Sequence, residues 1–549
     1  MKQAAQFGFY RTLYSQSAAS LTVSTTAGAV RQQGRSARLT LLAKGDHLNA
    51  SVLESERPAQ ASESTLFLKV NFQDAAESLP LADALSQHEL YRAVILFGIF
   101  AAGNASAILE RYPRIDGVVL GEPENVVPRV LAAIDEGLPL ATISGLLTSG
   151  APVRLTSERR EASPVQQDVI TLDEIKPVRD VEAREPGRLA NIESNRGCIA
   201  TCSFCHVPVV EQRFGAPRRR LRAVDRVIED VEDLVALGKR YFIFNDPVFW
   251  GGGSDTERVV ELAERLGAIR PRVQFMVYLR LAPFPDEELL AILARNGLIR
   301  VFIGVESDSS ETLKLYRKGA IGPGYADIRD LLDRYGVSHH IGFLTFNPFS
   351  SLGQIRHDVD FLDKHDQLHR IGVVLERTRL VPGTSLGARA QKEGLVTGDR
   401  DPLSCDAAYS WRFADEKVGT LHSHLQRVLV RGFGGRAKYL EYYHTSAGLL
   451  QYMVERDKEG QLEVERLWGP LKQLRTELAL TLRDFYMQAI DQASQTAAGA
   501  NHASDDIFLA SLTRLFARTQ VAYAALLAEV REAGHGEAIE SLFTSKEGY

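Results

Sequence analysis

The chain has 549 residues, 45% of them hydrophobic, and a formal net charge of −6. Its length allows about three domains, and its hydrophobic content excludes a disordered chain. A sequence pI of about 6.2 argues against a dedicated nucleic-acid-binding protein, and no apolar run reaches the ~20 residues of a membrane span.

The first residues, Met1–Ala5, lack the long apolar core of a signal peptide. We therefore expect the protein in the reducing cytoplasm, where free thiols persist. This location favours metal or cluster ligation over a disulfide for any group of cysteines.

Residues 1–150 alternate between strand and helix patterns. Five segments are predicted strands: Gln6–Tyr10, Ala37–Leu42, Thr65–Val70, Ala93–Phe97 and Gly117–Leu120. Helices are predicted over Ala18–Gln33, Ala105–Arg111 and Glu124–Glu136. Such alternation indicates an α/β domain whose parallel sheet is covered by helices on both faces.

Two segments follow neighbouring predicted strands, at the sheet edge where parallel α/β sheets bind ligands. Residues 98–104 form a predicted loop that begins at Gly98 and contains Gly103, and Gly121–Glu124 is the second segment. Gly98, Gly103 and Gly121 would let the backbone approach a ligand closely.

Residues 151–187 are rich in Pro, Glu and Arg and have no clear apolar period. We predict a linker that wraps between domains.

A second α/β unit is predicted over residues 188–395. Its six predicted strands are Leu189–Glu193, Tyr241–Asn245, Val273–Leu279, Val301–Val305, Ile341–Phe346 and Gly372–Glu376. Its helices are Asp225–Leu237, Thr256–Leu266, Asp286–Asn296, Tyr325–Tyr335 and Leu352–Lys364. Six strands are too few for a closed eight-stranded barrel, so we predict a partial (βα)6 barrel with its functional residues at the carboxyl ends of the strands.

Three of the four cysteines, Cys198, Cys202 and Cys205, stand in one short segment after the first predicted barrel strand. Thiolates are the ligands of iron–sulfur clusters, and three thiolates leave one iron of a four-iron cluster open to a small molecule. A Cys3His zinc site with His206 is an alternative, although zinc sites favour a ligand pair on each of two turns. A disulfide is a further alternative.

Basic and polar residues elsewhere have two interpretations each. The cluster Arg218–Arg220 with Arg222 is read as a solvated helix entry or as a small anionic ligand site. His339 and His340 begin the fifth barrel strand at the base of the barrel, and strand alternation sends them to opposite faces. They cannot readily share one ion.

Residues 396–549 are predicted to form a helical domain. Apolar residues recur at three- and four-residue spacing over Val418–Val430, Pro470–Gln492 and Asp506–Glu532. This domain could cap the active site, form a structural bundle or provide a dimer surface. Cys405 lies here, and a lone cysteine is usually a small buried apolar residue.

The Cys-x3-Cys-x2-Cys spacing, with Phe204 before the last cysteine, resembles the radical S-adenosylmethionine (SAM) enzymes. The resemblance extends to the partial barrel, to Gly304–Ser307 with the later Lys318-Gly319 pair, and to the Pro382–Thr384 turn near the predicted active-site rim. It implies a [4Fe–4S] cluster, SAM bound at the open iron, and an external one-electron reductant of flavodoxin or ferredoxin type. It also implies SAM contacts from these residues: Phe204, Asn245, Arg280, Glu306 and Ser307.

The segment Asp116–Glu124 resembles the cobalamin-binding domain of B12-dependent radical SAM enzymes. The resemblance implies a Rossmann-like domain that binds cobalamin through Tyr10, Phe72, Gly98, Gly103, Gly121 and Glu122. The Asp-x-His-x-x-Gly motif that ligates cobalt elsewhere is absent, and residues 1–150 contain only His47 and His88. We therefore expect cobalamin without a protein histidine ligand. A Rossmann-like domain that has lost its cofactor is the alternative.

By this resemblance, the expected activity is methylation of an unactivated carbon or a phosphinate phosphorus in a small-molecule substrate. A radical rearrangement, ring contraction, cyclisation or oxidation without methyl transfer is the alternative enzyme activity. A cluster-bearing electron-transfer or regulatory protein without turnover is a third reading. Neither a membrane nor a nucleic acid is an expected partner.

Overall fold

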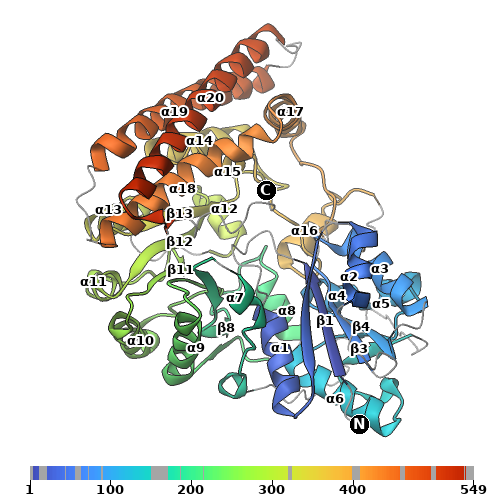
Figure 1. Cartoon of the computed structure of the whole chain (residues 1–549). Coiled ribbons are helices and arrows are strands. Elements are labelled where there is room, and N and C mark those ends of the chain that lie inside the picture. The colour runs from blue at the N-terminus through green and yellow to red at the C-terminus, as the bar shows by residue number, and fades with distance from the viewer. Residues whose placement is uncertain are drawn as a thin grey trace.

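The computed structural model describes residues 4–10, 21–43, 45–55, 64–71, 73–87, 91–149, 171–185, 187–213, 216–318, 324–398, 403, 408–457, 464–495, 502–536 and 538–539. The predictions for Phe72, Gly319 and Cys405 fall outside these residues. Figure 1 shows an N-terminal sheet with its helices (blue to cyan), a second sheet with its helices (green to yellow), and long C-terminal helices (orange to red).

The N-terminal sheet has six strands in the order β2-β1-β3-β4-β5-β6, of which the first five are parallel and β6 is antiparallel. The strands are β1 (Ala4–Tyr10), β2 (Ala37–Leu42), β3 (Ser64–Lys69), β4 (Ala93–Phe97), β5 (Gly117–Val119) and β6 (Leu146–Thr148). The helices are α1 (Leu21–Gln32), α2 (Asp46–Ser55), α3 (Ala75–Gln87), α4 (Ile99–Gly103), α5 (Ala105–Arg111) and α6 (Pro123–Glu136). Separate apolar clusters cover its two faces, which confirms the predicted α/β sheet.

The prediction that residues 98–104 form a loop is wrong for most of this segment. Residues Ile99–Gly103 form the short helix α4 directly after β4. Phe100, Ala101 and Ala102 are buried against the sheet, so the segment gains apolar contacts by coiling. The loop was predicted because Gly98 and Gly103 stand at the two ends of this segment, and glycine is typical of loops.

The second sheet has five parallel strands in the order β13-β12-β11-β10-β7. They are β7 (Leu189–Ile192), β10 (Tyr241–Phe244), β11 (Gln274–Arg280), β12 (Leu298–Glu306) and β13 (Ser338–Phe343). Helices α9 (Val224–Ala236), α10 (Thr256–Ala268), α11 (Glu287–Arg295), α12 (Ser310–Leu315), α13 (Tyr325–Arg334) and α14 (Leu352–Lys364) connect or flank them. A small antiparallel hairpin of β8 (Asn195–Gly197) and β9 (Arg219–Leu221), with α8 (Val207–Arg213) between its strands, surrounds the cysteine segment.

The predicted sixth strand, Gly372–Glu376, is wrong. Residues Ile371–Leu375 form the short helix α15, and one isolated parallel bridge, between Phe346 and Arg377, continues the sheet. The Glu441 carboxylate accepts a hydrogen bond from the Gly372 N–H at 2.9 Å, at the start of this helix. Apolar periodicity alone does not distinguish a short buried strand from a short buried helix.

The C-terminal helices are α16 (Ser385–Lys392), α17 (Glu416–Leu425) with a π-helical turn at Gln426–Gly432, α18 (Arg436–Asp457), α19 (Val464–Ser494) and α20 (His502–Glu532). Phe242 and Phe244 pack on the outer-helix side of the second sheet, whereas the alternate residues face the C-terminal helices. One apolar cluster joins that inner face to these helices: Tyr241, Ile243, Met276, Leu450, Met453 and Trp468. The helices therefore fill the open side of the barrel.

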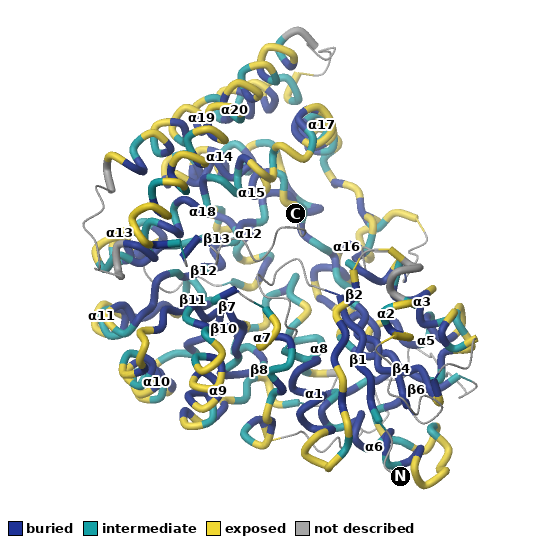
Figure 2. The backbone as a smooth tube through the Cα atoms, in the orientation of Figure 1, coloured by how far each residue is buried: buried dark blue, intermediate teal, exposed yellow. Residues whose placement is uncertain are grey.

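Burial follows this arrangement. Figure 2 shows the strands of both sheets as buried and the outward sides of the helices as exposed. Within the described residues, no helix combines the length and apolar character needed to cross a bilayer.

The described part of the predicted linker contacts both α/β units. The Val178 N–H donates to the Ser24 carbonyl at 3.1 Å, and Asp180 pairs with Arg31 of α1. The Asp173 carboxylate accepts from the Ala223 N–H at 2.7 Å, at the start of α9. This segment thus bridges the N-terminal sheet and the barrel.

Candidate active site

The cysteine segment begins at a backbone position that only glycine suits. Gly197 has a φ of +84°, and a Cβ there would overlap the carbonyl oxygen of Arg218. The same oxygen accepts a hydrogen bond from the Cys198 N–H at 2.8 Å. The β8–β9 hairpin thereby sets the position of the first thiol.

Asp246, which follows β10, holds the chain just before this hairpin. Its carboxylate accepts hydrogen bonds from the Ser194 N–H at 2.7 Å, the Ser194 hydroxyl at 2.6 Å and the Asn195 N–H at 3.1 Å. Complete burial raises the pKa of Asp246 to about 7, although these hydrogen bonds oppose the rise. Two strand ends, β7 and β10, are thereby joined.

The three thiols lie half-buried and unbridged on one segment. Ser203, between them, donates its N–H to the Tyr316 carbonyl at 3.0 Å and its hydroxyl to the Leu315 carbonyl at 2.7 Å. Burial, with the neighbouring cysteines, raises the pKa of Cys205 to about 11. Coordinated iron removes thiol protons, so three unbridged thiols on one segment supply the donor chemistry that an iron–sulfur cluster requires.

Arg280, at the end of β11, points toward the cysteine segment. Its Nη1 lies 3.4 Å from the Cys202 Sγ, and its Nε donates to the Ala282 carbonyl at 2.9 Å. The guanidinium therefore places a positive charge beside the predicted thiolates.

Glu306 ends β12 in a strained conformation. Its φ is +68°, and the register between β12 and β13 shifts between Gly304 and Glu306. Its carboxylate pairs with Lys318 at 2.8 Å, and Lys318 also donates to the Gly304 carbonyl at 2.6 Å. Bulges and left-handed non-glycine residues are enriched at functional sites, where surrounding contacts maintain the strain.

The other residues expected near SAM are placed differently. Ser307 is 1% exposed, and its hydroxyl donates to Asp358 at 3.2 Å, so it supports the turn after Glu306. Asn245 is exposed, and its Nδ2 donates to Asn191 at 3.0 Å. Phe204 is half-buried and packs edge-on to Tyr316, with ring centroids 5.0 Å apart.

A buried ion-pair network joins the N-terminal sheet to the cysteine segment. Arg196, two residues before Cys198, donates to Glu122 at 3.2 Å and to Glu124 at 2.7 Å. Glu122 is the N-cap residue of α6, directly after the β5 turn, and Glu124 lies in the first turn of α6. Arg220 on β9 also donates to Glu122, at 3.1 Å and 2.5 Å.

The charge state of Glu124 follows from this network. Burial alone would raise the pKa of this carboxyl, but the Arg196 charge and hydrogen bonds from Arg196 and Thr25 lower it below its usual value. The carboxylate is therefore ionised and held in place.

Three of the four arginines in the basic cluster after the cysteines form ion pairs. Arg219–Leu221 is a strand, and its neighbouring arginines pair with carboxylates: Arg219 with Asp255 at 2.8 Å and Arg222 with Asp230 at 2.7 Å. Acids distant in sequence therefore pair with Arg219, Arg220 and Arg222, whereas Arg218 donates to the Ile199 carbonyl at 2.6 Å.

The remaining residues predicted for cobalamin lie at the carboxyl ends of the N-terminal strands. Gly98 has a φ of +109°, and a Cβ there would lie 2.9 Å from the Val70 carbonyl oxygen. Gly103 ends α4 and is exposed, whereas Gly121 is buried. Tyr10 is 4% exposed and packs in the apolar cluster on one face of the sheet.

Sequence reasoning missed two residues near this edge. Ile99, directly after Gly98, is 55% exposed, which is unusual for a large apolar side chain beside a sheet edge. Arg196 was also missed, although an arginine immediately before the Gly197-Cys198 pair was a visible signal.

A cavity of about 1150 Å³ lies on the barrel side of the C-terminal helices. Arg377, which bridges to Phe346 beyond the carboxyl end of β13, contributes to its lining. The guanidinium carbon lies 3.8 Å from the centre of the Trp411 ring, and Nη2 donates to the Trp411 carbonyl at 2.8 Å. Helices α17 and α19 complete the wall.

Comparison with known sequences gives a family match over part of the chain. Residues 192–362 match the sequence model described as the Radical SAM superfamily. The chain is 24% identical over 337 residues to 4′-phospho-dehydrooxetanocin synthase of Priestia megaterium. That alignment covers 55% of this chain and 43% of that protein, so the chain spans less than half of this relative.

Comparison with solved structures gives matches over the whole fold. The cobalamin-dependent S-adenosylmethionine radical enzyme OxsB, solved with aqua-cobalamin, has a TM-score of 0.68 at 16% identity and covers 100% of this chain and 84% of that one. The radical S-adenosylmethionine methyltransferase TsrM from Kitasatospora setae has a TM-score of 0.57 at 16% identity. That match covers 90% of this chain and 100% of TsrM. At such identities the likeness establishes the fold alone.

Proposed function

We propose that the chain is a cobalamin-dependent radical SAM enzyme that methylates an unactivated carbon, or a phosphinate phosphorus, of a small-molecule substrate. A [4Fe–4S] cluster and SAM, when bound and reduced, supply a 5′-deoxyadenosyl radical, and bound cobalamin supplies the methyl group. The electron comes from an external donor of flavodoxin or ferredoxin type.

The residues around the cysteine segment have separable tasks in this proposal. Cys198, Cys202 and Cys205 would hold three irons of the cluster, and Arg280 would offset their negative charge from beside Cys202. Glu306, fixed by Lys318, presents a carboxylate at the strand end for a polar group of SAM.

One observation carries the cobalamin part of the proposal: the Arg196 bridge to Glu122 and Glu124. It ties the carboxyl-end turn of β5 to the chain that enters the cysteine segment. A methyl carrier and a substrate radical must meet within one enclosed cavity, because reaction requires close, oriented approach. The exposed Ile99 at the same sheet edge offers apolar surface for a corrin ring.

Hydroxocobalamin binding tests this proposal directly. Anaerobically reconstituted protein should retain about one equivalent of corrinoid per chain after gel filtration, read from its absorption spectrum. Gly98→Trp should abolish retention, because the side chain would enter the ligand edge of the sheet. Its iron content should stay near that of the wild type.

Gly137→Trp is the matched control. Gly137 also has a positive φ, +68°, in the same domain, but nothing lies within 4 Å of its Cβ position. It should retain corrinoid. Wild-type protein that binds no corrinoid while still making 5′-deoxyadenosine would rule out methyl transfer through cobalamin.

A radical rearrangement, ring contraction, cyclisation or oxidation without methyl transfer is the second candidate. The relative from Priestia megaterium is named as a synthase and not as a methyltransferase. Product mass separates the two candidates, because methylation adds about 14 Da and none of the alternative reactions adds this mass.

A further inference from the structure

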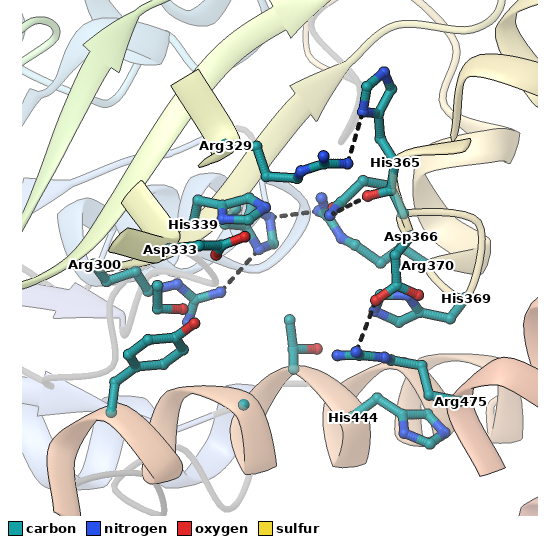
Figure 3. A pocket seen from close by; sticks show the side chains of 16 residues that line it. Arg300, Arg329, Asp333, His339, His365, Asp366, His369, Arg370, His444 and Arg475 are labelled. Carbon is teal, nitrogen blue, oxygen red and sulfur yellow. Dashed lines mark hydrogen bonds and ion pairs between the residues drawn. The ribbon is translucent and has the colours of Figure 1, made fainter. Parts of the chain in front are cut away.

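A cavity of about 330 Å³ lies at the amino-terminal ends of β12 and β13. The cysteine segment and Glu306 lie at the carboxyl ends of the barrel strands, so this cavity is remote from the candidate active site. Helices α18 and α19, from the C-terminal part of the chain, close the cavity. Figure 3 shows the side chains that line it.

Arginines outnumber carboxylates in the lining of this cavity. Four arginines reach it from four elements: Arg300, Arg329, Arg370 and Arg475. Asp333 and Asp366 are the carboxylates of the lining. Outside the lining, Asp330 pairs with Arg329 at 2.7 Å, and Glu441 lies 3.5 Å from Arg370.

The histidines of the lining add hydrogen-bonding groups without adding charge. Burial and the nearby arginines lower the pKa of His339 to about 4 and the pKa values of His340 and His369 well below the usual value. These imidazoles are therefore neutral near pH 7, and the lining carries two more positive than negative charges.

His340 is contacted by an arginine at each ring nitrogen. Nη2 of Arg300 lies 2.9 Å from Nδ1, and Nη2 of Arg370 lies 2.5 Å from Nε2. A neutral imidazole accepts a hydrogen bond at only one nitrogen, because the other carries a proton. One of the two Nη2 groups therefore faces the protonated ring nitrogen of His340.

Other buried nitrogens around the cavity also lack hydrogen-bond partners among the described residues. They are His339 Nδ1, His369 Nδ1, His444 Nε2 and Arg475 Nε. Arg475 Nε can only donate, and a neutral imidazole donates from whichever ring nitrogen carries its proton. A buried polar atom without a partner is unfavourable, so a ligand with acceptor oxygens could satisfy these nitrogens.

We propose that this cavity is a binding site for a phosphoryl oxyanion, either inorganic pyrophosphate or the phosphate end of a small phosphate ester. Guanidinium forks bind phosphate oxygens in pairs. In Figure 3, Arg300 and Arg475 extend toward the centre of the cavity from opposite sides. The volume lies at the low end of small-molecule sites, which run from about 300 to 1,000 Å³.

Calorimetric titration of the reconstituted holoenzyme tests this site. Pyrophosphate, inorganic phosphate and ATP are titrated separately, with sodium chloride at matched ionic strength as the blank. Pyrophosphate should bind saturably at about one per chain. ATP binding more tightly than pyrophosphate identifies a nucleotide, and equal affinity identifies recognition of the phosphoryl groups alone.

Variants locate the binding. Arg300→Gln and Arg475→Gln should each weaken pyrophosphate binding at least tenfold. Arg483→Gln is the matched control, because Arg483 lies on the same helix as Arg475 and pairs with Asp363 at 2.9 Å, as Arg475 pairs with Asp366 at 2.7 Å. Its dissociation constant should stay within twofold of the wild type.

No saturable heat with any of the three ligands on wild-type protein would overturn the proposal. Unchanged affinity in both cavity variants would place the binding elsewhere and overturn it as well. Should one variant fail to fold, the other decides, since Arg300 and Arg475 come from β12 and α19.

Discussion

The Arg196 guanidinium ties the N-terminal α/β unit to the cysteine segment. Arg196 contacts Glu122 and Glu124 from one part of the chain and Glu193, at 2.9 Å, from its own strand connection. All these groups are largely buried, so each charge depends on the others for compensation.

Arg196→Gln should therefore destabilise the protein severely. Removing one partner of a buried ion pair leaves uncompensated charge and costs about 3–5 kcal/mol. Urea unfolding of the apoprotein measures the change in the free energy of unfolding. We also expect reduced corrinoid retention, because the β5–α6 turn loses its anchor.

Arg265→Gln is the control for this substitution. Arg265 pairs with Asp225 on the surface, where an ion pair contributes about 0–1 kcal/mol. An Arg196→Gln protein as stable as Arg265→Gln would show that the bridge does not hold the two parts together.

The raised pKa of Asp246 makes the free energy of unfolding depend on pH. Its pKa is raised to about 7 in the folded protein, so the folded state holds a proton that the unfolded state releases near pH 4. The stability from this group is therefore fully present below about pH 4 and is lost as the pH rises through 7. Asp358, behind Ser307, has the same raised pKa of about 7 and acts in the same direction.

Asp246→Asn imitates the protonated carboxyl and should reduce the loss of stability between about pH 4 and 7. Urea unfolding at a series of pH values measures this slope. Asp358→Asn should remove a further part of it. Identical slopes in wild type and both variants would show that these carboxyls are ionised across the range.

At the scale of elements, the ends of parallel strands assemble the candidate active site. The cysteine segment lies beyond β7, after the short β8, while Asp246 follows β10, Arg280 ends β11 and Glu306 ends β12. Parallel strands bring their carboxyl ends to one edge, so residues distant in sequence meet there.

Glu306→Ala and Arg280→Ala should each weaken SAM binding while iron content stays near normal. Loss of a charged hydrogen bond is worth about 1.5–3 kcal/mol, which corresponds to roughly a tenfold to hundredfold rise in the dissociation constant. Equilibrium dialysis of anaerobically reconstituted protein measures it. Glu287→Ala, on the surface of α11, should bind SAM as the wild type does. If both site variants kept wild-type affinity, the two residues would be structural charges only.

Periodicity predicted the elements that bury long apolar runs. The strand at Ala93–Phe97 and the helix at Leu352–Lys364 have the predicted bounds. It failed for short segments such as Ile371–Leu375, whose conformation depends on contacts with α18. Pro470, expected to begin a helix, lies inside α19.

The residues of the candidate site were likewise only partly predictable from local sequence patterns. Local spacing identified the cysteines and the strand-end residues Arg280 and Glu306. The Arg196 bridge joins residues more than seventy positions apart. The hydrogen bonds from Ser194 and Asn195 to Asp246 join residues about fifty positions apart. No local pattern encodes such long-range ion pairs, because each depends on how the two sheets pack.

For the whole molecule, the C-terminal helices and the N-terminal sheet occupy different sides of the barrel. Helices α18 to α20 fill its open inner face through the Tyr241 and Met276 cluster, which favours a structural role over a simple cap. The N-terminal sheet meets the barrel at the cysteine segment (Figure 1). This arrangement leaves the carboxyl ends of both sheets available to a shared site.

The products of SAM test that shared site most directly. With dithionite as the reductant and no added substrate, reconstituted protein should cleave SAM to 5′-deoxyadenosine whether or not corrinoid is bound. It should also form about one equivalent of S-adenosylhomocysteine per corrinoid, since a methyl group leaves SAM only when the corrinoid accepts it.

Liquid chromatography with mass spectrometry quantifies both products in four samples: wild type with and without corrinoid, Gly98→Trp, and the triple variant Cys198→Ala, Cys202→Ala, Cys205→Ala. We predict S-adenosylhomocysteine only in the corrinoid-loaded wild type and no 5′-deoxyadenosine in the triple cysteine variant. Corrinoid-loaded wild type that forms no more S-adenosylhomocysteine than the corrinoid-free protein would contradict cobalamin-dependent methyl transfer.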